Sequence, residues 1–276
     1  TPMFIPPRKG QTADRVRQVG DPVAFVVAET LAQAQDAAEL VAIDYAILPS
    51  ITATAGAMAP GAVRIWDQCP GNESFAFELG DREAVDAAFA AAAHLTRIAY
   101  VVNRVSANAM EPRVSIGSYD RRDGHYTLHT STQGVHAVRA YVAEIMKLNQ
   151  SQIRVIAGDV GGAFGMKGDA YHDQVLVLWA SKLLERPVRW TADRSESLMS
   201  DAHGRDNVST VELALDSDAG FLALRVNTIA NVGAYMGMRG AHSPTNNLGG
   251  LAGVYTTPAI HVEVTGVFTN SNQTGP

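Results

Sequence analysis

The chain has 276 residues, of which 46% are hydrophobic and 18% charged, a composition typical of globular proteins and enough for a sizeable core. A formal net charge of −6 argues against a surface that binds nucleic acid or anionic membranes, so we expect no nucleic-acid partner. No apolar stretch reaches the roughly 20 residues of a membrane helix, and the first residues lack a signal-peptide pattern.

The single cysteine, Cys69, excludes three kinds of structure. These are a disulfide framework, a cysteine-based zinc site and an iron–sulfur cluster held by this chain alone. We therefore expect a cytoplasmic protein without a membrane span.

The first sixty residues carry a β-α-β pattern. Thr30 is a suitable N-cap for a helix, and apolar runs lie on both sides of that helix. The predicted elements are a strand at 23–28, a helix at 31–41 and a strand at 42–48.

Residues 50–64 form a linker rich in small residues, and we place a domain boundary there. The predicted domains are a small α/β module over 1–60 and a larger domain over 61–276. Both ends of the chain look cut, because it opens in mid-loop and closes directly after a strand-like run. We therefore expect part of a longer protein.

The larger domain alternates between helical and strand-like segments, which predicts an α+β fold with mixed sheets. Asp81 is a suitable N-cap for the first of its helices, and residues 121–124 form a hairpin turn. Helices are predicted at 82–93, 134–148 and 170–184, and strands at 94–105, 113–119, 125–132, 154–157, 188–190, 208–216, 221–235 and 259–270.

The segment GDVGGAFGMK, residues 158–167, lies between a predicted strand and a predicted helix. Glycine-rich turns in this position can bring backbone N–H groups close to a bound anion. The segment is not a Walker A loop, because Met166 separates Gly165 from Lys167 and no Ser or Thr follows. It is not a dinucleotide fingerprint either, since Val160 replaces a required glycine. A plain turn is an equal alternative on the pattern alone.

Phe164 favours a functional turn, since a bulky apolar side chain between glycines is costly to expose. It would pack under the loop or form the wall of a pocket. Gln133 lies where a predicted strand ends and a helix begins, so its amide could point into the same crevice. The alternative is that Ser131 or Thr132 simply caps that helix. We interpret His136 as a packed or surface residue.

Charged residues elsewhere have structural interpretations. Glu111 and Arg113 flank a proline and predict a structural ion pair. Residues 190–206 are dense in charge and predict a solvated or ion-paired loop, whose His-Gly-Arg run could bind an anion. His125 and His129 lie on one predicted strand face about 13 Å apart, too far to share a metal. A hydrolase has almost no support, because the H-E-x-x-H and G-x-S-x-G motifs are missing from the sequence.

Taken together, four segments in order resemble the molybdenum-binding large subunit of the xanthine dehydrogenase/aldehyde oxidase family, and most closely its aerobic carbon monoxide dehydrogenase large-subunit-like branch. They are STQGVHAVR, DVGGAFGMK, RPVRWTADRSESLMSDAHGRD and VNTIANVGAY. The segment from Gly20 to Ser50 resembles the α/β hammerhead module of that family. The resemblance covers the chain essentially from end to end.

The resemblance implies a molybdopterin cofactor with molybdenum, as the cytosine dinucleotide in most bacterial members. It implies that Gly161, Gly162, Ala163, Phe164 and Gly165 form the cofactor turn and that Gln133 donates its amide to an oxo ligand of the metal. The implied partners are the C-terminal half of the molybdenum subunit, an iron–sulfur small subunit and an FAD-binding medium subunit. The metal is held by pterin sulfurs, which is consistent with a single cysteine.

Two departures limit the resemblance. Ala163 replaces a common third glycine, so we expect its φ to be negative. Gly168 follows the lysine where purine-oxidising relatives carry a substrate-orienting glutamate, which argues against xanthine. The family's active loop and catalytic glutamate lie outside these residues. The expected substrate is therefore a small carbonyl, an aldehyde, an N-heterocycle or carbon monoxide, oxidised with water as oxygen source. The alternative is a non-catalytic split subunit or cofactor-binding assembly piece that needs a partner half.

Overall fold

The structure is a computed structural model that describes residues 3–7 and 9–275. Its described residues fall into two compact units that alternate along the chain. Among the described residues, the first unit comprises 3–6, 50–105 and 203–275, and the second comprises 7, 9–49 and 106–202. None of the helices in these described residues is long and apolar enough to cross a membrane.

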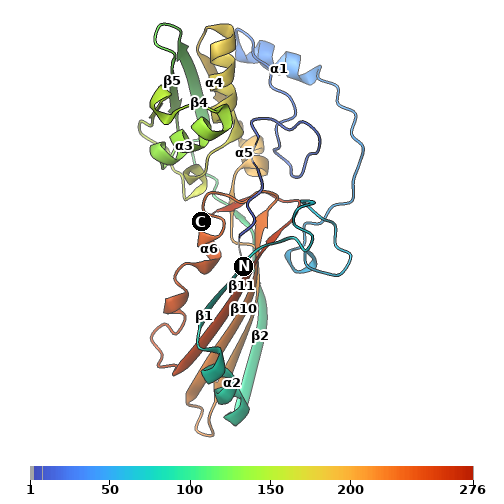
Figure 1. Ribbon diagram of the computed structural model, residues 1–276, viewed down its shortest axis with the longest axis vertical. Coiled ribbons are helices and arrows are strands. Elements are labelled where there is room, and N and C mark those ends of the chain that lie inside the picture. The colour runs from blue at the N-terminus through green and yellow to red at the C-terminus, as the bar shows by residue number, and fades with distance from the viewer. Residues whose placement is uncertain (1–2, 8, 276) are drawn as a thin grey trace. The chain divides into compact units, whose positions relative to one another are not determined.

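The first unit contains a five-stranded sheet of order β1-β11-β10-β9-β2, in which β10 and β11 are parallel and the other neighbours antiparallel (Figure 1). Helix α2, Arg82–Ala91, packs Val85 against Ala214 and Ala223 of this sheet. Its N-cap is Asp81, whose carboxylate accepts a hydrogen bond from Ala84 N at 2.9 Å. The strands are β1 Glu73–Gly80, β2 His94–Val102, β9 Asn207–Leu215, β10 Phe221–Gly233 and β11 Ala259–Phe268.

Shorter elements complete the described part of the first unit. Strand β8 pairs in parallel with β12. The bounds are η1 Thr54–Gly56, β8 His203–Gly204, α6 His242–Thr245, η4 Leu248–Gly250 and β12 Thr274–Gly275, with the short strand β3, Val105–Ser106, where the chain leaves this unit.

The second unit contains a four-stranded sheet of order β6-β5-β4-β7. Strands β5 and β6 are parallel, whereas β4 is antiparallel to both β5 and β7. The strands are β4 Val114–Asp120, β5 His125–Thr130, β6 Ile153–Ile156 and β7 Val188–Thr191, and the helices are α1 Leu31–Glu39, α3 Val135–Met146, η2 Gln150–Gln152, η3 Met166–Gly168, α4 His172–Leu184 and α5 Arg194–Ser200.

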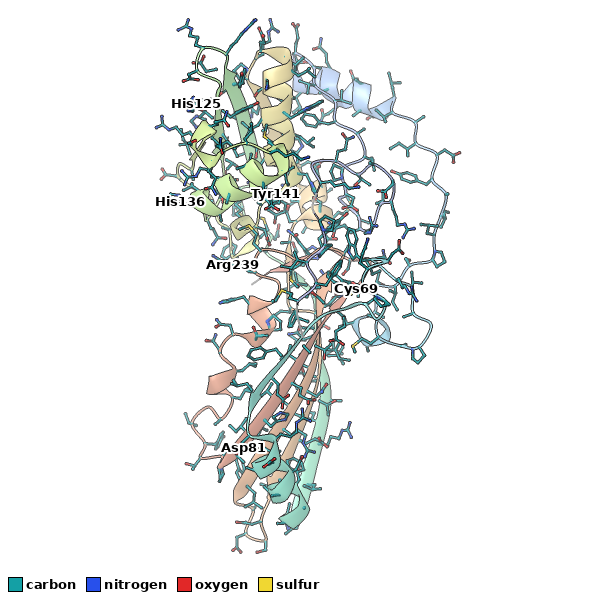
Figure 2. All side chains as sticks on the ribbon, viewed as in Figure 1. Cys69, Asp81, His125, His136, Tyr141 and Arg239 are labelled. Carbon is teal, nitrogen blue, oxygen red and sulfur yellow. The ribbon has the colours of Figure 1, made fainter. Side chains whose placement is uncertain are left out.

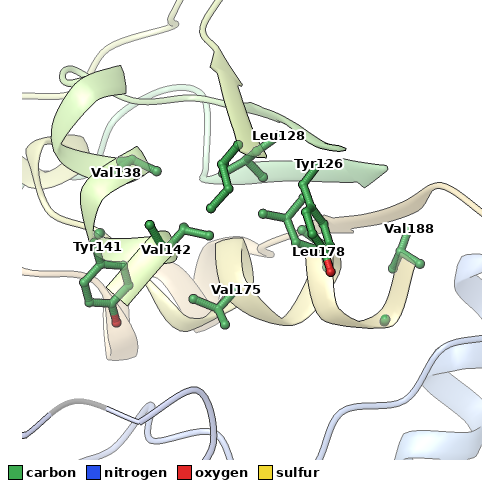
Figure 3. Packing of buried hydrophobic residues seen from close by; sticks show 13 residues of the cluster. Tyr126, Leu128, Val138, Tyr141, Val142, Val175, Leu178 and Val188 are labelled. Atoms are coloured by element: carbon green, nitrogen blue, oxygen red, sulfur yellow. The ribbon is translucent and has the colours of Figure 1, made fainter. Parts of the chain in front are cut away.

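Helices α3 and α4 enclose the core of the second unit against this sheet (Figure 3). Val138 and Val142 of α3 and Leu178 of α4 are fully buried with Leu128 of β5. Because α3 connects the parallel strands β5 and β6, the chain leaves both strands at the same end of the sheet. That end carries the segments after Thr130 and after Ile156.

The predicted helices and most predicted strands of residues 82–270 are confirmed, with bounds that differ by a few residues. The prediction of strands at 23–28 and 42–48 is wrong, because both described segments lack strand structure. A strand needs a neighbour to satisfy its backbone, and these segments pair with none in the described chain. The helix between them is present as α1, capped by Thr30, but it buries none of its residues.

The charged segment 190–206 was predicted as a loop, and this prediction is wrong for residues 194–200, which form α5. Asp193 caps this helix and accepts a hydrogen bond from Glu196 N at 2.6 Å. One of the points at which the chain passes from one unit to the other is residue 50, where the predicted linker begins. The division into domains 1–60 and 61–276 stays a prediction.

Candidate functional site

The two predicted motifs lie together at one end of the second unit's sheet. Gln133 follows β5, and the glycine turn of residues 161–165 follows β6. The backbone N–H of Gln133 donates a hydrogen bond at 3.0 Å to the carbonyl of Lys167, which lies two residues after the turn. The hydroxyl of Thr132 donates to the same carbonyl, also at 3.0 Å. The structure therefore joins two segments that are distant in sequence.

The glycine turn has an unusual backbone. Gly162 has a φ of 94°, Phe164 of 51° and Gly165 of 88°. Ala163 is not among the residues with positive φ, as predicted from the sequence. A positive φ costs little at glycine, but a bulky residue such as Phe164 adopts it rarely and under strain. Such strain, at about 1–3 kcal/mol, persists where surrounding structure enforces it and is often found at functional sites.

Phe164 does not pack beneath the turn. Its side chain is 72% exposed in this chain, whereas Met166, two residues later, is only 4% exposed. Of the two places predicted for this ring, packing under the loop is therefore wrong. The exposed ring is available to cover a ligand or another polypeptide.

The N–H groups of the turn divide into two sets. Gly161 donates to Glu111 Oε2 at 2.5 Å, and Gly162 donates to the carbonyl of Val160 at 2.9 Å. Within the described chain, the N–H groups of the next three residues, 163–165, have no hydrogen-bond partner. Successive amides around residues whose φ values differ in sign form concave sites that bind anions and other electron-rich atoms. Residues 163–165 thus offer successive donors to a ligand.

Gln133 is exposed, and its carboxamide makes no hydrogen bond to any other residue that the structure describes. The alternative, that Ser131 or Thr132 is the N-cap of α3, is wrong because the N-cap is Gly134, without a capping side chain. Ser131 instead accepts from Val114 N at 3.2 Å. Thr132 accepts from Gly134 N at 3.1 Å while it donates to Lys167. His136 is exposed on α3, in agreement with its interpretation as a surface residue (Figure 2).

Glu111 and Arg113 both form ion pairs, but not with each other. Glu111 Oε2 lies 3.0 Å from the buried ammonium of Lys167. Arg113 is buried and pairs with Asp173 and, at 2.6 Å, with Asp201. Burial alone would lower the pKa of Arg113, but the two carboxylates outweigh it and raise that pKa. The guanidinium therefore stays charged.

Tyr171 supports the end of the glycine turn. Its hydroxyl donates to the carbonyl of Met166 at 2.8 Å and accepts from Ala202 N at 3.1 Å. Burial raises the pKa of this phenol, so it remains a protonated donor. Arg113 stacks 3.8 Å above its ring.

The sequence did not indicate that Arg194 supports the site. Its guanidinium donates to the carbonyls of Ala109 and Met110, at 2.7 and 2.9 Å, and to the side chain of Asn108. These residues precede Glu111, and a Cβ placed on Gly162 would contact Ala109. The arginine thus fixes the segment that lies against the turn. The His-Gly-Arg run belongs to the first unit, and anion binding by it stays a prediction.

In the part of the chain that the structure describes, one group of side chains has a spacing suited to a metal: Glu78, His261 and Glu263, in the first unit. Arg82 forms ion pairs with both glutamates, and His261 lies 2.7 Å from Glu78. A guanidinium between the carboxylates supplies the positive charge that a cation would bring. We therefore interpret this group as an ion-pair cluster.

Comparison with known proteins agrees with this architecture. Residues 65–276 match the family described as the molybdopterin cofactor-binding domain, and residues 8–49 match the a/b hammerhead domain of aldehyde oxidase and xanthine dehydrogenase. The chain is 36% identical over 266 residues to the carbon monoxide dehydrogenase large chain of Afipia carboxidovorans, and the matched region covers 92% of this chain and 33% of the relative. It is 35% identical to the 6-hydroxypseudooxynicotine dehydrogenase complex subunit gamma of Paenarthrobacter nicotinovorans, over 95% of this chain and 32% of that subunit.

Solved structures of related proteins also match nearly the whole chain. A crystal structure of the Cu,Mo-CO dehydrogenase matches 96% of this chain and 35% of its own, with a TM-score of 0.89 and 33% identity. Quinoline 2-oxidoreductase from Pseudomonas putida 86 matches 99% of this chain and 35% of its own, with a TM-score of 0.87 and 31% identity. The chain belongs to the molybdopterin cofactor-binding domain family and spans about a third of the length of these relatives.

Proposed function

We propose that the chain forms part of the large subunit of a molybdenum-dependent hydroxylase, with Gln133 and the turn of residues 161–165 against a molybdopterin. The observation that carries this proposal is the set of free donors, namely the three amides of residues 163–165 and the carboxamide of Gln133, on two segments that are hydrogen-bonded to each other at the end of one sheet. Hydrogen bonds to charged oxygens contribute roughly 1.5–3 kcal/mol each. A few such donors suffice to orient a cofactor.

The residues present fit such a cofactor. Bound molybdopterin would supply a metal centre for two-electron oxidation of a substrate carbon, with oxygen from water. Its metal is held by sulfur atoms of the pterin, so no protein thiol is needed. Cys69 is not available as a ligand: it is 5% exposed in the first unit, and its thiol donates to the carbonyl of Glu73 at 3.1 Å.

Within the turn, different residues have different functions. Gly161 and Gly162 have their N–H groups occupied, so they shape the backbone and do not donate to the ligand. Ala163, Phe164 and Gly165 provide the donors, and the exposed ring of Phe164 excludes water from one side of the cofactor. Gln133 donates its carboxamide N–H to a polar atom of the bound group.

The substrate of the whole enzyme is a small molecule with an electron-poor carbon. The names of the relatives include a carbon monoxide dehydrogenase, a nicotine 6-hydroxylase and a quinoline 2-oxidoreductase. We rank an aldehyde or an N-heterocycle above carbon monoxide, and Gly168 argues against xanthine. We further propose the cytosine dinucleotide form of the cofactor, a cytoplasmic location, and partners that carry iron–sulfur clusters, FAD and the remaining part of the molybdenum subunit.

A second candidate function is that of a non-catalytic split subunit or assembly piece, and one observation favours it. The edge strand β2 exposes large apolar side chains, with Leu95 at 62%, Ile98 at 57% and Val101 at 59%. Exposed apolar surface of this kind is typical of regions that are covered by another polypeptide.

Mass spectrometry of the bound cofactor separates the two candidates when it is applied to the full-length enzyme, to this chain alone and to this chain with a partner half. A pterin dinucleotide bound to the full-length enzyme supports the hydroxylase. A chain that binds the cofactor only after a partner half is added supports the split subunit. In the full-length enzyme, Gln133→Ala is expected to lower turnover about 10- to 1000-fold, as for loss of a preorganised donor. Gln150→Ala, an exposed glutamine of η2, is the control. Unchanged turnover at full molybdenum content would remove Gln133 from the site.

A further inference from the structure

Lys167 joins the two motifs of the candidate site. Its carbonyl accepts hydrogen bonds from Thr132 and Gln133, which hold the Gln133 segment. Its side chain is 0% exposed, and its ammonium donates to Glu111 Oε2 at 3.0 Å. A buried ammonium is costly unless it is paired with an opposite charge. Lys167 therefore depends on Glu111.

Glu111 in turn holds the start of the glycine turn. The carboxylate oxygen that pairs with Lys167 also accepts the hydrogen bond from Gly161 N at 2.5 Å. In addition, Glu111 N donates to the carbonyl of Gly161 at 3.0 Å. The two residues are thus joined by both the backbone and the side chain. We call this arrangement the Glu111–Lys167 clamp.

The clamp has a consequence for the ligand-facing donors. The hydrogen bond from Gly161 N–H to the carboxylate of Glu111 fixes the position of the first residue of the turn. The strained φ of Phe164 lies three residues later. Loss of the carboxylate would release Gly161 and let the turn relax. The free amides of residues 163–165 would then no longer be held in one arrangement.

We propose that Glu111 is a positioning residue that holds the glycine turn in its ligand-binding conformation, and that Lys167 is the buried counter-ion that keeps its carboxylate in place. Neither residue needs to touch the bound group. This inference rests on the proposed function for the identity of the ligand, but the effect on the turn is measurable without any ligand.

The test uses three variants of the full-length enzyme: Glu111→Leu, Lys167→Met and the double variant. Each is measured for its thermal unfolding midpoint, for hydrogen exchange at the Gly161 amide, and for molybdenum and pterin per chain. Glu185→Leu is the matched control, because Glu185 forms an exposed ion pair with Arg121 at 3.0 Å in the same unit. All three measurements are expected to stay unchanged in this control.

The clamp predicts that stability and cofactor retention separate. Glu111→Leu leaves a buried unpaired ammonium, so its unfolding midpoint falls, whereas the double variant removes both charges and recovers most of the loss. In both of these variants, exchange at Gly161 accelerates about tenfold or more and cofactor content falls several-fold, because the charged acceptor is gone. Lys167→Met keeps the acceptor and has the smaller effect on exchange.

If the double variant recovers cofactor content and slow exchange together with stability, the pair is only structural and the inference is overturned. If the unmodified enzyme contains no molybdopterin, the proposed function fails. The exchange measurement then decides the inference alone: fast exchange at Gly161 in Glu111→Leu supports the clamp, and unchanged exchange overturns it.

Discussion

Replacing Gly161 by alanine tests the packing of the turn more sharply than any other single substitution. A Cβ built at this position lies 2.6 Å from Glu111 Cβ, closer than such atoms approach in real structures. The contact is with the first side-chain carbon of Glu111, which cannot move without its backbone. The substitution must therefore displace the segment that carries Glu111, or the turn itself.

The expected cost has two parts. Overpacking of this kind destabilises by about 1–3 kcal/mol. Loss of the charge-assisted hydrogen bond from Gly161 to Glu111 adds roughly 1.5–3 kcal/mol when the acceptor is not satisfied otherwise. Because water can reach the partly exposed carboxylate, we expect a total of about 2–4 kcal/mol.

Denaturant unfolding gives the free energy of unfolding directly, and molybdenum content measured in parallel shows whether the turn still holds its ligand. Gly158→Ala is the control, because a Cβ at Gly158 meets nothing within 4 Å. A value for Gly161→Ala within about 0.5 kcal/mol of the unmodified protein would refute the close contact and the arrangement derived from it.

Three further predictions follow from other contacts. Phe164→Asn should raise the free energy of unfolding by about 0.5–1 kcal/mol in denaturant titrations, because asparagine tolerates a positive φ and the lost ring is mostly exposed, yet it should lower turnover. Equal loss of stability and turnover would count against this. Arg113→Met should destabilise by about 3–5 kcal/mol, since it leaves Asp173 and Asp201 buried without a counter-ion, and thermal unfolding should show it. Burial raises the pKa of the Cys69 thiol, so the thiolate form is disfavoured in the folded state. The stability that this group contributes is present below the ordinary pKa of a thiol and is lost as pH rises through the higher pKa of the folded state. Alkylation of Cys69 should therefore be slow until the protein unfolds, and rapid alkylation at pH 8 would contradict its burial.

The position of the candidate site was predictable from the sequence because it depends on local order. A strand, a helix and a second strand in succession favour parallel pairing, which brings the residues after both strands to the same end of the sheet. The sequence suggested a shared crevice because Gln133 follows a predicted strand, and the parallel pairing of β5 and β6 explains why its segment and the turn of residues 161–165 lie at one end of the sheet. The expected negative φ of Ala163 followed instead from the family resemblance, because alanine replaces a glycine that is common at this position.

Contacts between distant segments were not predictable. The pairing of Glu111 with Lys167 and of Arg113 with Asp173 depends on the three-dimensional path of the chain, and single charged residues give no signal of their partners. The nearer residue was therefore assumed to be the partner of Glu111. The prediction of strands at 23–28 and 42–48 was wrong for a related reason. An apolar pattern predicts a strand, but it does not show whether a neighbouring strand is present to pair with it.

Two elements were missed although the sequence carried a signal. Asp193 and Glu196 have the spacing of an N-cap and a third helical residue, which predicts the start of α5. In β1, Phe75, Phe77 and Leu79 alternate with polar or small residues, as expected of a strand. The many charges around α5 obscured its N-cap pattern, and the nearby linker obscured the alternation in β1.

X-ray diffraction from crystals of the complete enzyme, recorded above the molybdenum absorption edge, tests the central claim most directly. The account predicts that the strongest anomalous peak, from molybdenum and not from the weaker scatterer iron, lies beside the carboxamide of Gln133 and the amides of residues 163–165. A peak in another part of the molecule, with these donors facing only solvent or protein, would contradict it.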